Sequence, residues 1–203
     1  MKVLPYDPQN KAGILAEALV VLLSGGTVVY PTETAYGLGA DFFSPRAYQR
    51  VFAIKNRSER KPLPVIIPNF QYAQTIVSFT PEASKLAQKY WPGPLTLVLP
   101  FLYAKEWTHH GDAYLALRVS SHPFAASLAQ AFGRPLIATS ANISCDKACY
   151  SAEAVIRQMS QSHLTPDLVI DMGDLPDIEP STMVRVDDQG IAVLRSGPIR
   201  IKL

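Results

Sequence analysis

Apolar residues follow two spacings along this chain: short unbroken runs, and positions three or four apart. Short apolar runs between prolines, glycines and polar clusters are typical of buried strands, and the wider spacing is typical of helices with one buried face. The pattern predicts strands at 27–30, 62–67, 95–100, 114–119, 135–140, 167–173, 182–186 and 191–195. It predicts helices between Asp7 and Gly25 and over 45–54, 81–90, 123–132 and 151–159.

Strands and helices alternate through most of this order, which indicates an α/β fold. The last strands are separated by short turns such as residues 187–190, which leave no room for a helix. They must pair antiparallel or cross over without a helix, so the sheet is expected to be mixed. At 203 residues the chain suits one large α/β domain or two small ones.

Composition excludes few functions. The apolar fraction of 48% suits a sizeable core and excludes a disordered chain. A net charge of +2 does not separate a nucleic-acid protein from other classes. Cys145 and Cys149 lack nearby histidine or further cysteine partners, so we expect reduced thiols rather than a metal site. The sequence contains no apolar signal core and no membrane-length run, so we expect a soluble cytoplasmic protein.

A dense basic stretch follows the helix predicted over 45–54 and contains Lys55, Arg57, Arg60 and Lys61. One interpretation is a solvated turn that complements the helix dipole. The other is a clamp for a phosphate chain, because arginine offers a planar fork of donors and lysine a compact charge. Neither GxxxxGK[ST] nor GxGxxG occurs, so a bound nucleotide would use neither of these glycine loops.

Polar residues gather where predicted strands end, which is where open α/β sheets bind ligands. Ser140 and Asn142 come at the end of the strand over 135–140 and stand two apart, so an extended segment would point both to one side. They either line a pocket or close a turn on their own backbone. Arg195 ends another strand and is either an ion-pair residue or a ligand group.

Several short motifs occur here in the order in which the YrdC/TsaC family has them: PTETAYGLG (31–39), KNR (55–57), YWPGPLTLVL (90–99), LRVSSHP (117–123), ATSANIS (138–144), PSTMVRV (180–186) and LRSGPI (194–199). The chain therefore resembles that family over nearly its whole length. The resemblance implies an L-threonylcarbamoyladenylate synthase, which joins threonine, bicarbonate and ATP, releases pyrophosphate and serves the t6A37 modification of tRNA. It also implies a single domain over 1–203, of the short type, with a twisted mixed β-sheet flanked by helices and a deep basic cavity.

The same resemblance implies roles for individual residues. Lys55 and Arg57 match the family's KxR pair and are the expected catalytic cations; as surface-type residues they are also expected to be dispensable for folding. The expected threonine-binding residues are Thr34, Arg118, Ser140 and Ser181. The expected ATP-binding residues are Arg57, Lys61, Asn142, Ser151 and Arg195. The threonines of PTET and Tyr36 are expected to form one wall of the cavity, beside a sharp backbone turn at Gly37 and Gly39.

Three positions depart from the family's pattern. Ser58 replaces the usual proline after KxR, Ile66 stands where some members have a histidine, and Ser120 turns RVP into RVS. The expected cofactor chemistry is ATP as a substrate, with Mg²⁺ held mainly by phosphates and water and no metal bound by the protein.

The expected partners are ATP, L-threonine and bicarbonate, with tRNA and the t6A transferase complex as further candidates and no membrane. The alternative function is an RNA-binding module of the same fold without synthase activity. Pyrophosphate release that needs all three substrates would separate the two, because a binding module would show none.

Overall fold

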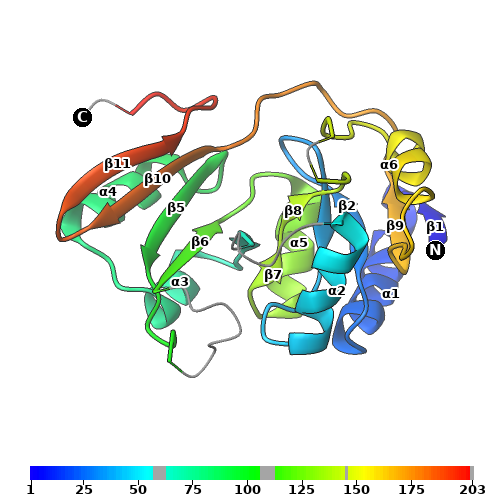
Figure 1. Cartoon of the computed structure of the whole chain (residues 1–203), viewed down its shortest axis with the longest axis horizontal. Helices are drawn as coiled ribbons and strands as arrows, with labels where there is room; N and C mark the ends of the chain where they lie inside the picture. The colour runs from blue at the N-terminus through cyan, green and yellow to red at the C-terminus, as the bar shows by residue number, and fades with distance from the viewer. Residues whose placement is uncertain (57–62, 106–112, 145, 202–203) are drawn as a thin grey trace.

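Two mixed β-sheets form the frame of the molecule (Figure 1). The computed structural model describes residues 1–56, 63–105, 113–144 and 146–201. The strands of the first sheet are, in spatial order, β1 (Lys2–Pro5), β9 (Leu168–Asp171), β2 (Val28–Pro31), β3 (Tyr36–Gly39) and β8 (Thr139–Ser140). Those of the second are β11 (Gly190–Arg195), β10 (Thr182–Asp187), β5 (Leu95–Pro100), β6 (Tyr114–Arg118), β4 (Val65–Ile66) and β7 (Leu136–Ile137). Parallel and antiparallel pairs occur in both, so the α/β fold with mixed pairing is confirmed, although in two sheets rather than one.

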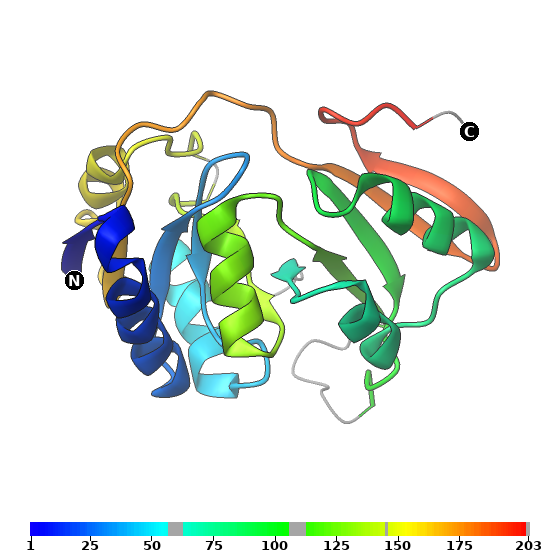
Figure 2. The same cartoon turned by 180° about the vertical axis from the view of Figure 1, so that it is seen from behind.

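Helices cover both faces of the first sheet and one face of the second. They are α1 (Lys11–Leu23), which follows a short 3-10 turn at Pro8–Asn10, α2 (Pro45–Lys55), α3 (Phe70–Ile76), α4 (Pro81–Tyr90), α5 (Pro123–Phe132) and α6 (Ala152–Met159). Figure 1 shows α2 and α6 in front of the first sheet, and Figure 2 shows α1 and α5 on its other face and α4 over the second sheet. Ser44, Thr80 and Ser151 cap α2, α4 and α6 by accepting a backbone N–H of the first turn.

The strand predicted over 135–140 is two strands that belong to different sheets. β7 pairs with β4 of the second sheet, and β8 pairs with β3 of the first. Ala138, between them, donates its N–H to the carbonyl of Pro64 at 2.8 Å. The chain therefore crosses from one sheet to the other at Ala138 and places Ser140 at the edge of the first sheet.

The stretch after PTET is a strand rather than a glycine turn. β3 pairs antiparallel with β2, and neither Gly37 nor Gly39 has a positive φ. A Cβ on Gly39 would lie 2.6 Å from Cε1 of Tyr30, which is closer than real side-chain atoms approach. Close packing against the Tyr30 ring therefore explains Gly39, and the sharp backbone turn predicted at these glycines is wrong.

Two apolar clusters hold the sheets to their helices. One contains Leu22, Val28, Phe124 and Ile170, and it joins α1 and α5 to the first sheet. The larger one joins both sheets to α2, α4 and α6. Burial of this apolar surface is the main stabilising contribution to such a fold, and it holds the strand ends that carry polar residues in fixed positions. None of the helices in the described part of the chain is long and apolar enough to span a bilayer.

Candidate active site

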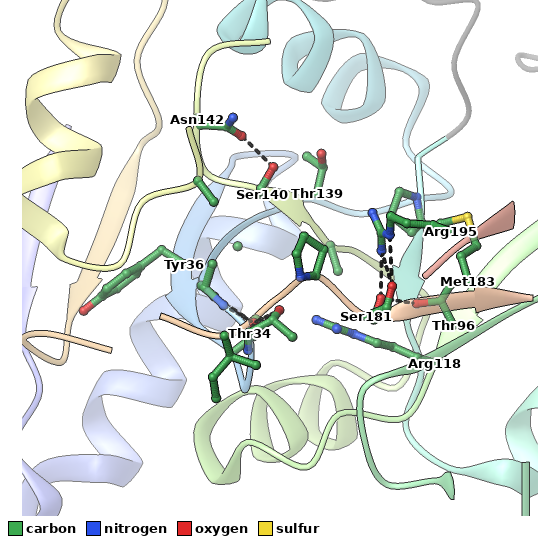
Figure 3. A pocket seen from close by; sticks show the side chains of 18 of the residues that line it. Thr34, Tyr36, Thr96, Arg118, Thr139, Ser140, Asn142, Ser181, Met183 and Arg195 are labelled. Atoms are coloured by element: carbon green, nitrogen blue, oxygen red, sulfur yellow. Dashed lines mark hydrogen bonds between the residues drawn. The ribbon is translucent and has the colours of Figure 1, made fainter. Parts of the chain in front are cut away.

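A cavity of about 540 Å³ lies between the two sheets (Figure 3). This volume falls within the usual range for small-molecule sites, about 300–1,000 Å³. One side, which we call the amide wall, belongs to the first-sheet half of the molecule and comprises Thr34, Tyr36, Ser140 and Asn142. The other side, which we call the arginine wall, belongs to the second-sheet half and comprises Thr96, Arg118, Ser181 and Arg195.

The turn between β2 and β3 is fixed by one hydroxyl. Thr32 Oγ1 donates to the carbonyl of Ala35 at 2.7 Å and accepts the backbone N–H groups of Thr34 and Ala35, each at 3.3 Å. Such bonds between a hydroxyl and the nearby backbone stabilise tight turns. The Thr34 hydroxyl lies 3.2 Å from Thr32 Oγ1 and lines the cavity, so a rigid turn presents it.

Tyr36 lines the cavity, but its hydroxyl does not face it. The hydroxyl donates to the carbonyl of Gly173 at 2.8 Å and accepts the N–H of Met172 at 2.9 Å. Figure 3 shows it pointing away from Thr34 and Ser140. Burial raises the pKa of Tyr36 to about 12, so the phenol is neutral at physiological pH. Tyr36 therefore shapes the wall, and its hydroxyl holds the segment after β9 through these two hydrogen bonds instead of facing a ligand.

Ser140 and Asn142 both line the cavity, on the same side, as their spacing predicts. The hydroxyl of Ser140 donates to Oδ1 of Asn142 at 2.5 Å, and Nδ2 of Asn142 donates to the carbonyl of Asp146 at 2.6 Å. The amide is thus held at both ends by the protein. This pair combines the two interpretations of the sequence, because it closes a turn and lines a pocket at once.

Lys55 lies behind this pair, and its burial contradicts the expectation of a surface residue. It ends α2, is 2% exposed and is not among the described residues that line the cavity. Its Nζ donates to the carbonyl of Asn142 at 2.8 Å, to Oδ1 of Asn142 at 3.0 Å and to the carbonyl of Ser140. A buried ammonium needs such acceptors to offset its lost hydration. Lys55 therefore organises the amide wall from beneath.

The arginine wall presents its charge differently. Nε and Nη2 of Arg195 donate to the carbonyl of Ser181 at 2.9 and 2.7 Å, and Nη2 also donates to the Ser181 hydroxyl at 2.9 Å. The hydroxyls of Ser181 and Thr96 lie 2.7 Å apart. Desolvation and, after it, the charge of Arg118 lower the pKa of Arg195 below its ordinary range. Both arginines line the same cavity. This wall offers positive charge directly to a ligand.

A family model for Sua5, YciO and YrdC proteins, described as "Telomere recombination", matches residues 20–197. The chain belongs to the Sua5/YciO/YrdC family. A threonylcarbamoyl-AMP synthase of Halorhodospira halophila is 41% identical over 152 residues, which are 74% of this chain and 80% of that protein. Another, of Photorhabdus laumondii, is 36% identical over 154 residues, which are 73% of this chain and 82% of that protein.

Solved structures agree with this membership. Sua5 of P. abyssi in complex with L-threonine has a TM-score of 0.85 and 31% identity, and the match covers 97% of this chain and 57% of that one. YciO of E. coli has a TM-score of 0.82 and 23% identity, with 99% of this chain and 97% of that chain covered. The likeness to YciO supports the YrdC-like fold alone.

Six of the residues expected from the YrdC/TsaC motifs meet in one cavity. They are Thr34, Arg118, Ser140, Asn142, Ser181 and Arg195. Ser151 follows the lining residue Tyr150 but is not itself among the described lining residues, and its hydroxyl caps α6 by accepting the N–H of Ala154 at 3.1 Å. Arg57 and Lys61 fall outside the described residues, so the basic clamp stays a prediction. Ile66, at the position where some family members have a histidine, is buried in the apolar cluster under α5.

Sequence reasoning missed four polar lining residues, Thr96, Thr139, Asp146 and Tyr150. Thr96 interrupts the apolar strand over 95–100 and Thr139 stands beside Ser140, so both had a signal. Asp146 and Tyr150 stand in an irregular polar segment without one. Asp146 is the one carboxylate among the described lining residues. The described residues hold no cluster of three or more His, Cys, Asp or Glu side chains suited to a metal ion, and Cys145 lies outside them.

Proposed function

We propose that this chain is a threonylcarbamoyl-AMP synthase, a nucleotidyltransferase that forms threonylcarbamoyl-AMP and pyrophosphate from L-threonine, bicarbonate and ATP. Relatives that carry this name share 36–41% of their residues with it over about three quarters of its length. The observation that carries the proposal is the single cavity in which an amide wall and an arginine wall meet. Guanidinium groups suit carboxylates and phosphates, and neutral amides and hydroxyls suit the remaining polar groups.

The proposed reaction has two steps. The amine of threonine adds to bicarbonate with loss of water, which gives a carbamate. A carbamate oxygen then attacks the α-phosphorus of ATP, and pyrophosphate leaves as the P–O bond to it breaks. No bond to the protein forms, so the site needs to orient the reactants and neutralise developing charge rather than supply a nucleophile. A cavity set between two sheets also limits the access of water to the labile carbamate.

The arginine wall is the proposed site for the threonine carboxylate. Arg118 ends β6, is 7% exposed and lines the cavity, where its planar fork would pair with a carboxylate. Figure 3 shows its side chain reaching towards Thr34 on the amide wall. Thr34, Ser140 and Ser181 would offer hydroxyl oxygens to the ammonium and hydroxyl groups of the substrate.

ATP is proposed to bind to residues of both walls that are not assigned to threonine, Arg195 on the arginine wall and Asn142 on the amide wall. Arg195 would neutralise phosphate charge, and Asn142 would bind the nucleotide. Arg57, Lys61 and Ser151 remain in this proposal on the family likeness. Lys55 would act by holding the carbonyls that shape the amide wall and by contributing positive potential through it.

Magnesium would enter with ATP, because the described lining residues include too few carboxylates to form a cage for the ion. Asp146 could add one oxygen ligand to those of the phosphates and of water. When bound, Mg²⁺ would neutralise charge on the phosphate oxygens.

The later fate of the product is proposed on the family likeness alone. The threonylcarbamoyl group would pass to tRNA in the t6A modification, in the cytoplasm, through a transferase complex that accepts the intermediate. We also propose, on the same family likeness, that this chain binds tRNA directly.

The decisive experiment measures pyrophosphate release by the purified chain with each of the three substrates left out in turn. We expect release with all of them present and background release without threonine or bicarbonate, together with a product of the mass of threonylcarbamoyl-AMP. No release under any condition, together with salt-sensitive RNA binding, would instead support the RNA-binding module.

A further inference from the structure

Glu33 stands in the middle of the PTET turn but is not among the described residues that line the cavity. Its Oε1 lies 3.1 Å from Nη1 of Arg118, and the two side chains are 12% and 9% exposed. An ion pair so far removed from water is little screened by salt. No hydrogen bond from the described residues to Oε1 accompanies it, so the attraction between the two side chains is that of their charges. The pair joins the turn between β2 and β3 to the end of β6, and so joins the two halves of the molecule beside the cavity.

Ser120 holds the same carboxylate from its other side. Its hydroxyl donates to Oε2 of Glu33 and accepts the backbone N–H of His122 at 3.2 Å. Ser120 is one of the departures from the family's motif, and the proline expected there has no hydroxyl to donate. Ser120 thus holds Oε2 of Glu33 through a hydrogen bond, and Arg118 faces Oε1 across the ion pair.

We propose that Glu33 is a positioning residue for substrate recognition: anchored by Ser120, it orients the Arg118 guanidinium that receives the carboxylate of the amino-acid substrate. The inference rests on the proposed function. An arginine side chain has several rotatable bonds, and a fork that binds a carboxylate through two parallel hydrogen bonds must present one defined edge. The ion pair with Glu33 draws Nη1 of Arg118 to one side before the ligand arrives, so less side-chain freedom is lost on binding.

The charge of Glu33 has an opposite effect, which determines the choice of variants. A carboxylate near the site repels the substrate carboxylate, so Glu33→Gln would remove both the orientation and the repulsion. Glu33→Asp keeps the charge and withdraws it from Arg118 by one methylene group. Ser120→Ala keeps both charges and removes the anchor. These two variants therefore isolate positioning from net charge.

The test measures KM for L-threonine, KM for ATP and kcat from pyrophosphate release. For Glu33→Asp we expect KM for L-threonine to rise about tenfold, and for Ser120→Ala about threefold, within the range of couplings between residues in contact. KM for ATP and kcat should stay within about twofold of wild type, because neither variant removes a group proposed to touch the nucleotide. Titration calorimetry with L-threonine alone should show the same loss of affinity.

Controls come from a more exposed ion pair and from a hydroxyl, neither of which lines the cavity. Glu17→Asp alters a glutamate paired with Lys2, and Ser162→Ala removes a hydroxyl that donates to the carbonyl of Ile54 at 3.0 Å. Both should leave the two KM values unchanged. A second measurement adds Glu33→Asp to Arg118→Lys. If Glu33 acts through Arg118, the aspartate should cause little further loss of threonine affinity in that background.

The outcomes separate this inference from the proposed function. Wild-type protein without threonine-dependent pyrophosphate release contradicts the synthase itself. An active wild type combined with unchanged KM for L-threonine in both variants overturns the role of Glu33 alone. Equal losses for threonine and ATP, or a full additional loss in the Arg118→Lys background, also overturn it, since a purely structural role predicts those results.

Discussion

The two walls of the cavity place their positive charge in opposite ways. On the amide wall the charge of Lys55 is buried behind the surface, where carbonyl and amide oxygens surround it. On the arginine wall the guanidinium groups of Arg118 and Arg195 line the cavity themselves, and the charge of Glu33 balances one of them. On the amide wall a buried cation supports neutral groups that line the cavity, whereas on the arginine wall the cations line the cavity themselves.

This difference indicates where a loss of activity should occur without a loss of stability. A cation that organises backbone carbonyls cannot be removed without disturbing the fold, because the acceptors around it remain buried and unsatisfied. A cation that faces a cavity can be replaced with a smaller effect on stability, because water can enter the vacated space. The amide wall should therefore link stability to activity. On the arginine wall the same separation is expected at the more exposed Arg195, whereas Arg118 is buried beside Glu33.

The largest expected effect follows from Lys55→Ala. Removal of the ammonium takes one donor from each of three oxygens, the carbonyls of Ser140 and Asn142 and Oδ1 of Asn142, so we expect about 2–4 kcal/mol lower free energy of unfolding. Pyrophosphate release should fall about a hundredfold or more as the amide wall loses its shape. Denaturant unfolding and the pyrophosphate assay measure the two losses.

The sequence alone suggests the opposite result for stability, since a lysine at a helix end is ordinarily exposed. Lys105→Ala, at another lysine, serves as the control and should leave the free energy of unfolding within about 0.5 kcal/mol. If Lys55→Ala unfolds like the wild type, Lys55 does not organise the amide wall and the contrast between the walls fails.

The next effect concerns Asn142→Ala. The amide links the hydroxyl of Ser140 to the carbonyl of Asp146, so its removal frees both partners at the cavity surface. We expect ATP affinity to weaken by about 1–3 kcal/mol, as for a lost hydrogen bond that leaves its partners unsatisfied. Calorimetry with ATP measures the affinity, and an unchanged dissociation constant would place the nucleotide away from this amide.

On the arginine wall, Arg195→Lys should weaken ATP binding about tenfold, or about 1.4 kcal/mol, with little change in the free energy of unfolding. A lysine keeps the charge but cannot donate through two nitrogens to the Ser181 carbonyl while it faces a phosphate. Thermal unfolding and KM for ATP give the two readouts. A large loss of stability would mean that this wall, too, is built by its cation.

Local patterns predicted those parts of the molecule in which neighbours along the chain decide the structure. The helix over 81–90 and the strand over 95–100 have the bounds expected from their caps, prolines and apolar spacing. β1 escaped prediction because it is short and largely exposed, and β3 because its glycines suggest a turn. Its glycines make sense only beside the Tyr30 ring, which lies on another strand.

The candidate site shows the same limit. Ser140 and Asn142 could be predicted to share one side from their spacing alone, and the cavity includes both. The burial of Lys55 could not, because its acceptors come from a segment far along the chain. Nor could the pairing of Glu33 with Arg118, which depends on how the two sheets are placed. Spacing predicts the direction of a side chain, whereas only the assembled fold determines its partner.

The smallest expected effect concerns His122, which follows Ser120 by two residues and begins α5 as its N-cap. Its Nδ1 accepts the N–H of Phe124 at 3.3 Å and caps α5, so a proton on that nitrogen would break the cap. Burial lowers the pKa of His122 below its ordinary value of 6.5, against a smaller opposing effect of the Glu33 charge. The unfolded chain therefore binds the proton more tightly than the folded one.

The stability that neutral His122 contributes is thus fully present above pH 6.5 and is lost as the pH falls from there towards the lower pKa of the folded state. His122→Asn keeps a side chain able to cap the helix but removes the titration. We expect the melting temperature of the wild type to fall more steeply than that of His122→Asn between about pH 7.5 and about pH 5.5. Both proteins share their other titrating groups, so the difference between the two curves isolates this histidine. Parallel curves would show that protonation leaves the cap intact, and a steeper fall in the variant would reverse the predicted sign.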